Sequence, residues 1–145
     1  AMDRKEYLSM SHNDRQKMTG KIKKFLFADE KIVFAYIFGS FLNSPNFRDI
    51  DVGIYLGNIA KESVFDKEME MAKKISEACG LPIDVIDAKI LNFAPSHFLN
   101  NVFKNGVVLF SKNEKLLSDL IEETSLNTVA NEYFSYQSLK ELVPR

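Results

Sequence analysis

Aspartate residues interrupt two apolar stretches of this chain at positions where a carboxylate is costly. Asp49 and Asp51 open the stretch 49–56, and their spacing of two places both side chains on one face of a β-strand. Asp84 lies inside the short apolar stretch 83–86, where a lone buried carboxylate is expensive. If the two strands are neighbours, three carboxylates meet on one patch, and a hard divalent cation such as Mg²⁺ stabilises them most simply. The pattern predicts a metal site formed by Asp49, Asp51 and Asp84.

Gly39 and Ser40 follow directly after the apolar run 32–38 and are residue types suited to phosphate binding. A glycine lets a phosphate approach the backbone, and a serine hydroxyl adds a donor beside exposed N–H groups. An ordinary strand-ending turn explains a Gly-Ser pair equally well when the pair is taken alone. Its position ahead of the acidic pair favours the hypothesis that Gly39 and Ser40 bind phosphate.

Other titratable residues are interpreted as structural. His12, His97 and Cys79 are too widely spaced to form a zinc site. Asp87 is three residues beyond Asp84, and this odd offset predicts that the two side chains leave opposite faces of a strand. Asp87 is therefore left out of the predicted site.

The spacing of apolar residues predicts alternating helices and strands that position these side chains. Helices are expected from Asn13 or Asp14 to Phe27, over 62–79, near 96–104 and over 113–139, with Gly80 as a left-handed cap. Strands are expected over 32–38, 49–56, 83–86 and 107–110. Because residues 41–48 form only a short connection, the first two strands pair antiparallel and the sheet is mixed. The predicted fold class is α/β (α+β), a small mixed β-sheet flanked by helices.

Composition limits the class of protein. The 145 residues fit a single domain, expected over 1–141, and the final Leu-Val-Pro-Arg at 142–145 looks like the remnant of a cleaved tag. The 19 basic and 20 acidic side chains nearly cancel, which argues against a protein that coats nucleic acid or an anionic membrane. No apolar run approaches the ~20 residues that span a bilayer. A single cysteine and the lack of a signal-peptide pattern indicate a cytoplasmic protein.

The string Ile37-Phe38-Gly39-Ser40, followed after eight residues by Asp49-Ile50-Asp51, resembles the signature of the DNA polymerase beta-like nucleotidyltransferases. More narrowly, the chain looks like the minimal nucleotidyltransferase (MNT) proteins, which are about this size. Residues 81–87 resemble the family's third-carboxylate strand, and residues 105–110 resemble the small strand after it. The resemblance extends over roughly residues 14–140 and implies a polymerase-beta-like nucleotidyltransferase fold.

In that family, three carboxylates bind two Mg²⁺ ions that hold a nucleoside triphosphate against an acceptor hydroxyl. The resemblance implies that Asp49 and Asp51 bridge the metals and the phosphates. It implies that Asp84 binds the catalytic metal and helps to deprotonate the acceptor, and that Gly39 and Ser40 contact the triphosphate. The cofactor would then be Mg²⁺ (two ions) and the substrate ATP, because two ions stabilise both the entering and the leaving oxygen of an in-line displacement.

Many MNT proteins are antitoxins that are paired with a helical HEPN-family ribonuclease toxin and attach AMP to one of its tyrosines. The resemblance therefore implies a Mg-dependent protein adenylyltransferase whose partner is a HEPN toxin. Segment 1–24 has a net charge of about +4 and segment 114–141 about −4. These segments are candidate docking faces, and ordinary solvated helix surfaces are the alternative.

Two other functions remain open at this point. A catalytically weak or inactive module of the same fold would neutralise its partner by binding alone. The short connection 41–48 favours this alternative, since it lacks the basic and glycine residues common in the family. The second alternative is a transferase that acts on a small-molecule hydroxyl or on a nucleic acid end. Near-neutral charge argues against nucleic acid, and a chain this short lacks the extra domain that usually builds a small-acceptor pocket.

Overall fold

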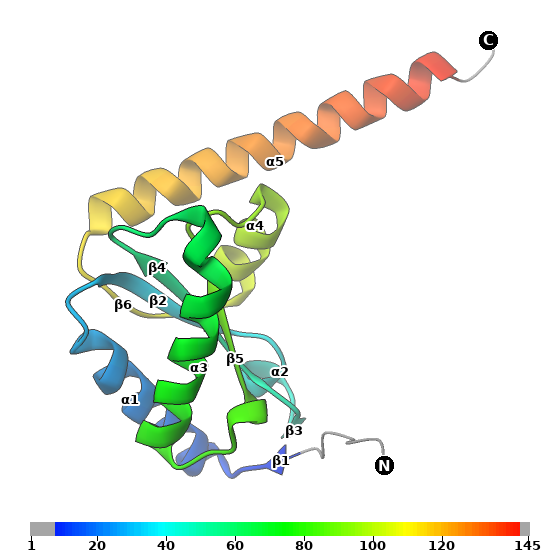
Figure 1. Ribbon diagram of the computed structural model, residues 1–145. Coiled ribbons are helices and arrows are strands. Elements are labelled where there is room, and N and C mark those ends of the chain that lie inside the picture. The colour runs from blue at the N-terminus through cyan, green and yellow to red at the C-terminus, as the bar shows by residue number, and fades with distance from the viewer. Residues whose placement is uncertain (1–7, 143–145) are drawn as a thin grey trace.

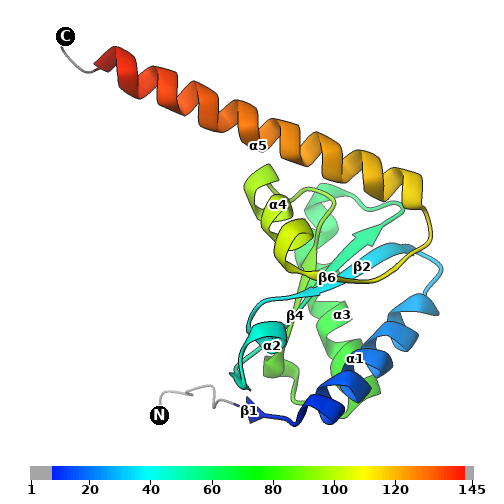
Figure 2. The same ribbon diagram turned by 180° about the vertical axis from the view of Figure 1, so that it is seen from behind.

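Residues 8–142 are described by the computed structural model, in which helices cover both faces of a central sheet (Figures 1 and 2). In chain order the elements are β1 (Leu8–Ser9), α1 (His12–Phe27), β2 (Ile32–Phe38), α2 (Ser40–Asn43), β3 (Asn46–Phe47), β4 (Ile50–Leu56), η1 (Lys61–Ser63), α3 (Val64–Cys79), η2 (Ile83–Val85), β5 (Ile86–Ile90), α4 (Ser96–Asn105), β6 (Val107–Ser111) and α5 (Glu114–Leu142). Most of the expected tag remnant, residues 143–145, lies outside the described part of the chain.

The main sheet has the strand order β5-β4-β2-β6. Strand β2 pairs antiparallel with both β4 and β6, whereas β4 pairs parallel with β5. The predicted mixed sheet is thereby confirmed, because the short connection makes β2 and β4 antiparallel and α3 provides the crossover that a parallel pair needs. A separate two-stranded sheet of β1 and β3 lies beside α2, at the end of the molecule near the N-terminus (Figure 1).

Alternate residues of the central strands face two different helical layers. On one face, α1 and α3 pack through residues such as Ile22 and Met71. On the other face, α4 and the start of α5 pack through Leu99 and Leu117 against aromatic residues of β2, including Phe34. Because helices cover both of its faces, β2 is apolar along its whole length rather than alternating.

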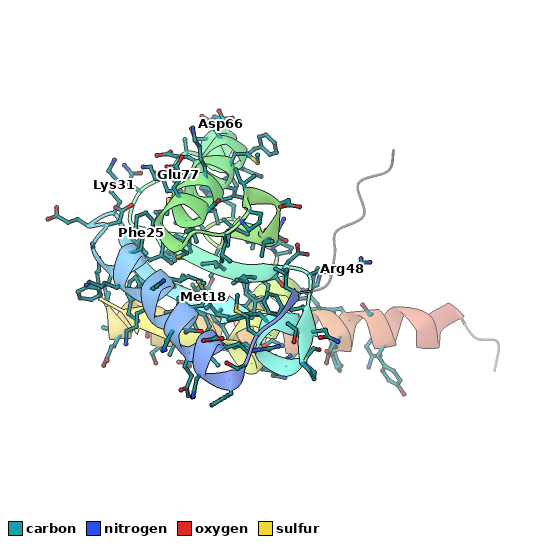
Figure 3. All side chains as sticks on the ribbon, turned by 90° about the horizontal axis from the view of Figure 1, so that it is seen from below. Met18, Phe25, Lys31, Arg48, Asp66 and Glu77 are labelled. Atoms are coloured by element: carbon teal, nitrogen blue, oxygen red, sulfur yellow. The ribbon has the colours of Figure 1, made fainter. Side chains whose placement is uncertain are left out.

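The α1–α3 layer is seen from below in Figure 3, where the two helices lie side by side. Met18 and Phe25 of α1 are partly buried there and pack against the core of this layer. Helix α3 ends at Gly80, whose φ of 68° confirms the expected left-handed cap. A side chain would be strained at this position, which explains why a glycine ends the helix.

The segment before β5 differs from the prediction. Residues 83–85 form the 3-10 helix η2, and the strand begins only at Ile86, so the strand predicted over 83–86 is wrong in its first three residues. Ile83 is 48% exposed, so this apolar residue is not buried in the sheet as a strand over 83–86 would require. The period-two burial that defines the strand starts later, with Ile86, Ala88 and Ile90 facing the α1–α3 layer.

Helix α5 packs on the domain only through its first half. Leu117 and Thr124 are buried, whereas Leu126, Val129 and Tyr133 are each more than half exposed. In Figures 1 and 2 the second half of the helix extends beyond the sheet and the other helices. Among the described residues, no helix combines the length and the apolar character needed to cross a bilayer.

Candidate active site

Asp51 and Asp87 lie opposite each other on neighbouring strands. The parallel register of β4 and β5 pairs Asp51 with Asp87. Their chain neighbours Val52 and Ala88 belong to the α1–α3 core, so both carboxyl groups project to the face that α4 covers. The two carboxyl groups are close enough to share a hydrogen bond when one of them carries a proton.

The surroundings of the Asp51 carboxyl group favour its protonated form. Burial, with smaller contributions from the charge of Asp87, a hydrogen bond with Asp87 and the charge of Asp49, raises the pKa of Asp51 to about 7. Lys89 opposes this effect, with its Nζ 3.5 Å from Asp87 Oδ1. Asp51 and Asp87 thus bring two carboxyl groups together with Asp49 within electrostatic reach, and carboxylate oxygens are the ligands that a hard divalent cation prefers.

The other two predicted carboxylates occupy different surroundings. Asp49 lies immediately before β4, is partly buried and acts on Asp51 electrostatically, as its sequence spacing suggested. Asp84 lies in η2, is exposed and is not among the charges that perturb Asp51. The spacing in the sequence predicts Asp84 on the strand and Asp87 on the opposite face of that strand. The observed strand instead carries Asp87 beside Asp51, because β5 begins two residues after Asp84.

Gly39 follows the last residue of β2 and lies against the carboxyl group of Asp51. Its φ of 83° falls in the region that favours glycine, and a Cβ at this position would be 2.1 Å from Asp51 Oδ2. Phe38, the residue before it, is paired with Asp51 in the β2–β4 ladder. The next residue, Ser40, is exposed at the start of α2. The structure therefore brings Gly39 and Asp51 together, as the phosphate-and-metal hypothesis requires.

Arg15 of α1 holds the connection between Ser40 and Asp49 in place. Its Nη1 donates a hydrogen bond of 2.7 Å to the carbonyl of Phe41, and its Nη2 donates to the carbonyl of Pro45. The guanidinium carbon also lies 5.6 Å and 5.1 Å from the ring centres of Phe41 and Phe47. Both rings are buried and meet edge to face at 4.9 Å, so the short connection is a packed segment rather than a loose loop.

The expected group of three metal-binding carboxylates is not assembled within residues 8–142, where no three His, Cys, Asp or Glu side chains come close enough to hold an ion. The structure assembles a pair, Asp51 and Asp87, with Asp49 within electrostatic reach. The predicted site leaves out Asp87, although the sequence contains one signal for it. In residues 86–90 the apolar and charged residues alternate strictly, and this alternation sets Asp87 and Lys89 together on one face.

Comparison with known proteins identifies the family of the domain that carries these residues. Residues 20–115 match the family model of polymerase beta nucleotidyltransferases. This range contains all the predicted site residues, Gly39, Ser40, Asp49, Asp51 and Asp84, and also Asp87. No curated protein is similar enough to this chain to be counted as a relative.

Several solved structures share the fold. A Shewanella oneidensis MNT antitoxin, in complex with a tri-AMPylated HEPN toxin, is similar over 88% of this chain and 96% of that one, with 19% identity and a TM-score of 0.61. A toxin-antitoxin structure with AMP-PNP is similar over 85% and 95% of the two chains, with 20% identity and a TM-score of 0.62. A structure of the toxin-antitoxin pair MntA-HepT is similar over 87% of this chain and 96% of that one, with 20% identity and a TM-score of 0.59. Because the family model matches well over half of its length, this chain belongs to the polymerase beta nucleotidyltransferase family.

Proposed function

We propose that this protein is an MNT antitoxin that transfers AMP from ATP to a hydroxyl of a cognate HEPN toxin, most simply a tyrosine. The observation that carries the proposal is the carboxyl pair Asp51–Asp87 with the backbone of Gly39 packed against it. Structural neighbours that are MNT antitoxins in complex with HEPN toxins, one of them AMPylated, support the choice of partner. The structure with AMP-PNP supports an adenine nucleotide as the substrate.

Different residues bind the triphosphate and accept the proton in the proposed in-line displacement. Gly39 and Ser40 bind the triphosphate, since a residue without a side chain lets the phosphates approach Asp51. The acceptor oxygen forms a bond to the α-phosphorus, and the bond from that phosphorus to the bridging oxygen breaks, releasing pyrophosphate. The acceptor proton passes to the carboxylate of Asp87. Asp87 thus takes the role that the resemblance assigned to Asp84.

The donor set suits Mg²⁺, which prefers carboxylate oxygens and commonly uses one or two of them together with substrate phosphates. The juxtaposition of two carboxyl groups, Asp51 and Asp87 at paired positions of neighbouring strands, is the observation that supports this fit. Asp49, Asp51 and Asp87 would hold the ion together with the nucleotide. When bound, Mg²⁺ would neutralise charge on the entering and leaving oxygens.

The binding-only alternative predicts that none of these carboxylates matters for neutralisation. This alternative is disfavoured because the partly buried carboxyl pair, in which the pKa of Asp51 is raised to about 7, lowers the stability of the folded protein near neutral pH. A protein that catalyses no reaction has no use for such a pair. The small-molecule alternative gains no support from the comparisons, since the similar structures are toxin-antitoxin pairs.

The test compares two conservative variants, Asp87→Asn and Asp84→Asn, incubated with the toxin, labelled ATP and Mg²⁺. We expect Asp87→Asn to lower the transfer of label by at least about 100-fold, because both a metal ligand and the proton acceptor are lost. Asp84→Asn should transfer label at close to the wild-type rate. The reverse result would restore Asp84 as the third carboxylate. Full protection of cells from the toxin by the double variant Asp49→Asn/Asp51→Asn would favour neutralisation by binding alone.

A further inference from the structure

Helix α5 changes the direction of its apolar face near its middle. In the first half, Leu117 and Thr124 are buried against the domain. Leu126 follows Thr124 by two residues, which is about 200° around the helix axis, and its side chain is 64% exposed. Val129 and Tyr133 continue from Leu126 along the same side of the helix and are also exposed. The apolar face of the second half therefore points away from the domain on which the first half packs.

The side of the second half that faces α4 is polar. A cavity of about 490 Å³ lies between the two helices, and all its lining side chains carry polar atoms: His97 of α4, with Thr128, Asn131, Glu132, Ser135 and Tyr136 of α5. If α5 moved closer to α4, it would bury these polar groups and leave Leu126 and Val129 in water. The exposed apolar face is therefore not an unpacked part of the domain core.

The exposed apolar residues have the spacing by which one helix packs on another. Leu126, Val129, Tyr133 and Tyr136 are separated by three, four and three residues, as in a coiled-coil contact. Phe134 widens this surface, with its ring centre 5.8 Å from that of Tyr133. Each of these five side chains is more than half exposed, and together they form the α5 stripe. The spacing indicates that the occupant of the α5 stripe is a helix.

The charges around the α5 stripe are all negative. Glu122, one turn before Leu126, and Glu132 are both exposed. The stretch 116–139 contains no Lys, Arg or His. An amphipathic helix that binds an anionic membrane carries basic residues on its polar side, so this stretch does not fit a membrane surface. Its charge favours a partner helix whose apolar side chains are flanked by lysine or arginine.

A second copy of this chain is a poorer occupant. Residues 126–136 cover about 15 Å of helix, and two such segments paired through faces about 10 Å wide bury far less than the ~1,200 Å² of a stable interface. The two helices would also bring only acidic side chains to the contact, and like charges repel. The α5 stripe therefore fits a different protein better than it fits itself.

We propose that the α5 stripe is the surface that binds the toxin, through a toxin helix whose apolar side chains are flanked by lysine or arginine. This inference rests on the proposed function, which supplies the toxin as the partner, and adds to it the place where the toxin is held. The toxin must also bring its hydroxyl to Asp51 and Asp87, so one partner makes two contacts and binds more tightly than through either alone. The α5 stripe contains no carboxylate of the active site, so binding and transfer can be separated by substitution.

The first experiment titrates the purified toxin into this protein by calorimetry, with a chelator and without nucleotide, so that no transfer takes place. Val129→Asp places a charge in the middle of the α5 stripe and should weaken binding at least about tenfold. Asn131→Asp adds the same charge on the polar side of the helix and should bind like the wild type. Both positions are exposed, so both variants should keep the wild-type melting temperature.

The outcomes separate this inference from the proposed function. Wild-type affinity in Val129→Asp, or no binding of the toxin by the wild type, would overturn the inference, and transfer of label would still test the function. Analytical ultracentrifugation of the protein alone tests the second copy, since a wild-type dimer that becomes a monomer in Val129→Asp would also overturn the inference. If the toxin binds through the α5 stripe but is never labelled with ATP and Mg²⁺, the proposed transfer fails while the docking surface stands.

A second experiment tests the charge of the partner. Glu122→Lys/Glu132→Lys should weaken toxin binding at least about tenfold at low salt and should reduce the loss of affinity as salt is added, because fewer opposite charges meet at the interface. The matched control is Glu62→Lys/Glu77→Lys, at exposed positions of η1 and α3. Unchanged or tighter binding in Glu122→Lys/Glu132→Lys would show that the partner surface is not basic and would overturn the inference.

Discussion

At position 39, any side chain would occupy the space that the carboxyl group of Asp51 fills. The backbone of Gly39 approaches Asp51 so closely that a Cβ would lie 2.1 Å from Oδ2, and its φ of 83° is itself unfavourable for other residues. Gly80 has a similar φ of 68°, but nothing lies within 4 Å of where its Cβ would be. The two glycines therefore separate the cost of backbone strain from the cost of displacing a site residue.

We expect Gly39→Ala to lower transfer activity by at least about 100-fold, because the methyl group moves the Asp51 carboxyl. Gly80→Ala should keep normal activity. Both variants should lose about 1–2 kcal/mol of unfolding free energy to the positive φ. Thermal denaturation and label transfer, measured on the same preparations, check this. Equal activity in the two variants would show that the contact between Gly39 and Asp51 has no role in catalysis.

At the scale of elements, α1 and the connection between β2 and β4 form one unit. Arg15 joins them by hydrogen bonds to the carbonyls of Met10, Phe41 and Pro45 and by its position over two phenylalanine rings. The connection was expected to be turn and loop alone, yet it contains α2 and β3. Its packing explains how a short segment holds Gly39 and Asp49 in fixed places at its two ends.

Substitution of Arg15 tests this coupling between elements. Arg15→Ala should lower the free energy of unfolding by about 2–3 kcal/mol, since charge-assisted hydrogen bonds and cation–π contacts are lost together. Arg15→Lys should recover only part of this loss, because an ammonium group lacks the planar fork that reaches two carbonyls. Lys17→Ala, an exposed change on the same helix, is the control. Chemical denaturation measures all three. A wild-type stability for Arg15→Ala would show that the connection is held by its aromatic packing alone.

At the scale of the whole molecule, the parallel pairing of β4 and β5 brings the partly buried carboxyl groups of Asp51 and Asp87 together on one face of the sheet. Burial and Asp87 hold the pKa of Asp51 at about 7, against 3.8 for an ordinary aspartate. The folded state therefore binds a proton more tightly than the unfolded state. This contribution to stability is full below about pH 4 and is lost as the pH rises to 7 and above.

We expect the free energy of unfolding to fall by about 1–3 kcal/mol between pH 4 and pH 8 through this pair. Asp51→Asn should flatten that part of the profile, whereas Asp84→Asn should leave it unchanged. At pH 8, millimolar Mg²⁺ with AMP-PNP should raise the melting temperature of the wild type, and a chelator should reverse the rise. Thermal melts across the pH range measure each effect. A profile in Asp51→Asn identical to that of the wild type would contradict the carboxyl pair as its origin.

The sequence by itself determined those parts of the site that lie close together along the chain. Gly39, Ser40, Asp49 and Asp51 are joined by one short connection, and the apolar runs on either side specify β2 and β4 and their antiparallel pairing. The mixed sheet, the cap at Gly80 and the long C-terminal helix follow from local patterns in the same way. Local propensity and hydrophobic periodicity are sufficient for such features.

Only the tertiary structure decided which carboxylate joins Asp51. Asp84 and Asp87 both flank apolar residues, and the choice depends on where β5 begins and on its register against β4. A shift of a strand by one residue exchanges its two faces, so a small error in the start of β5 exchanges the side chains that reach the site. That register is set by the packing of Ile86, Ala88 and Ile90 against the α1–α3 core, a long-range interaction that no local pattern around Asp84 contains.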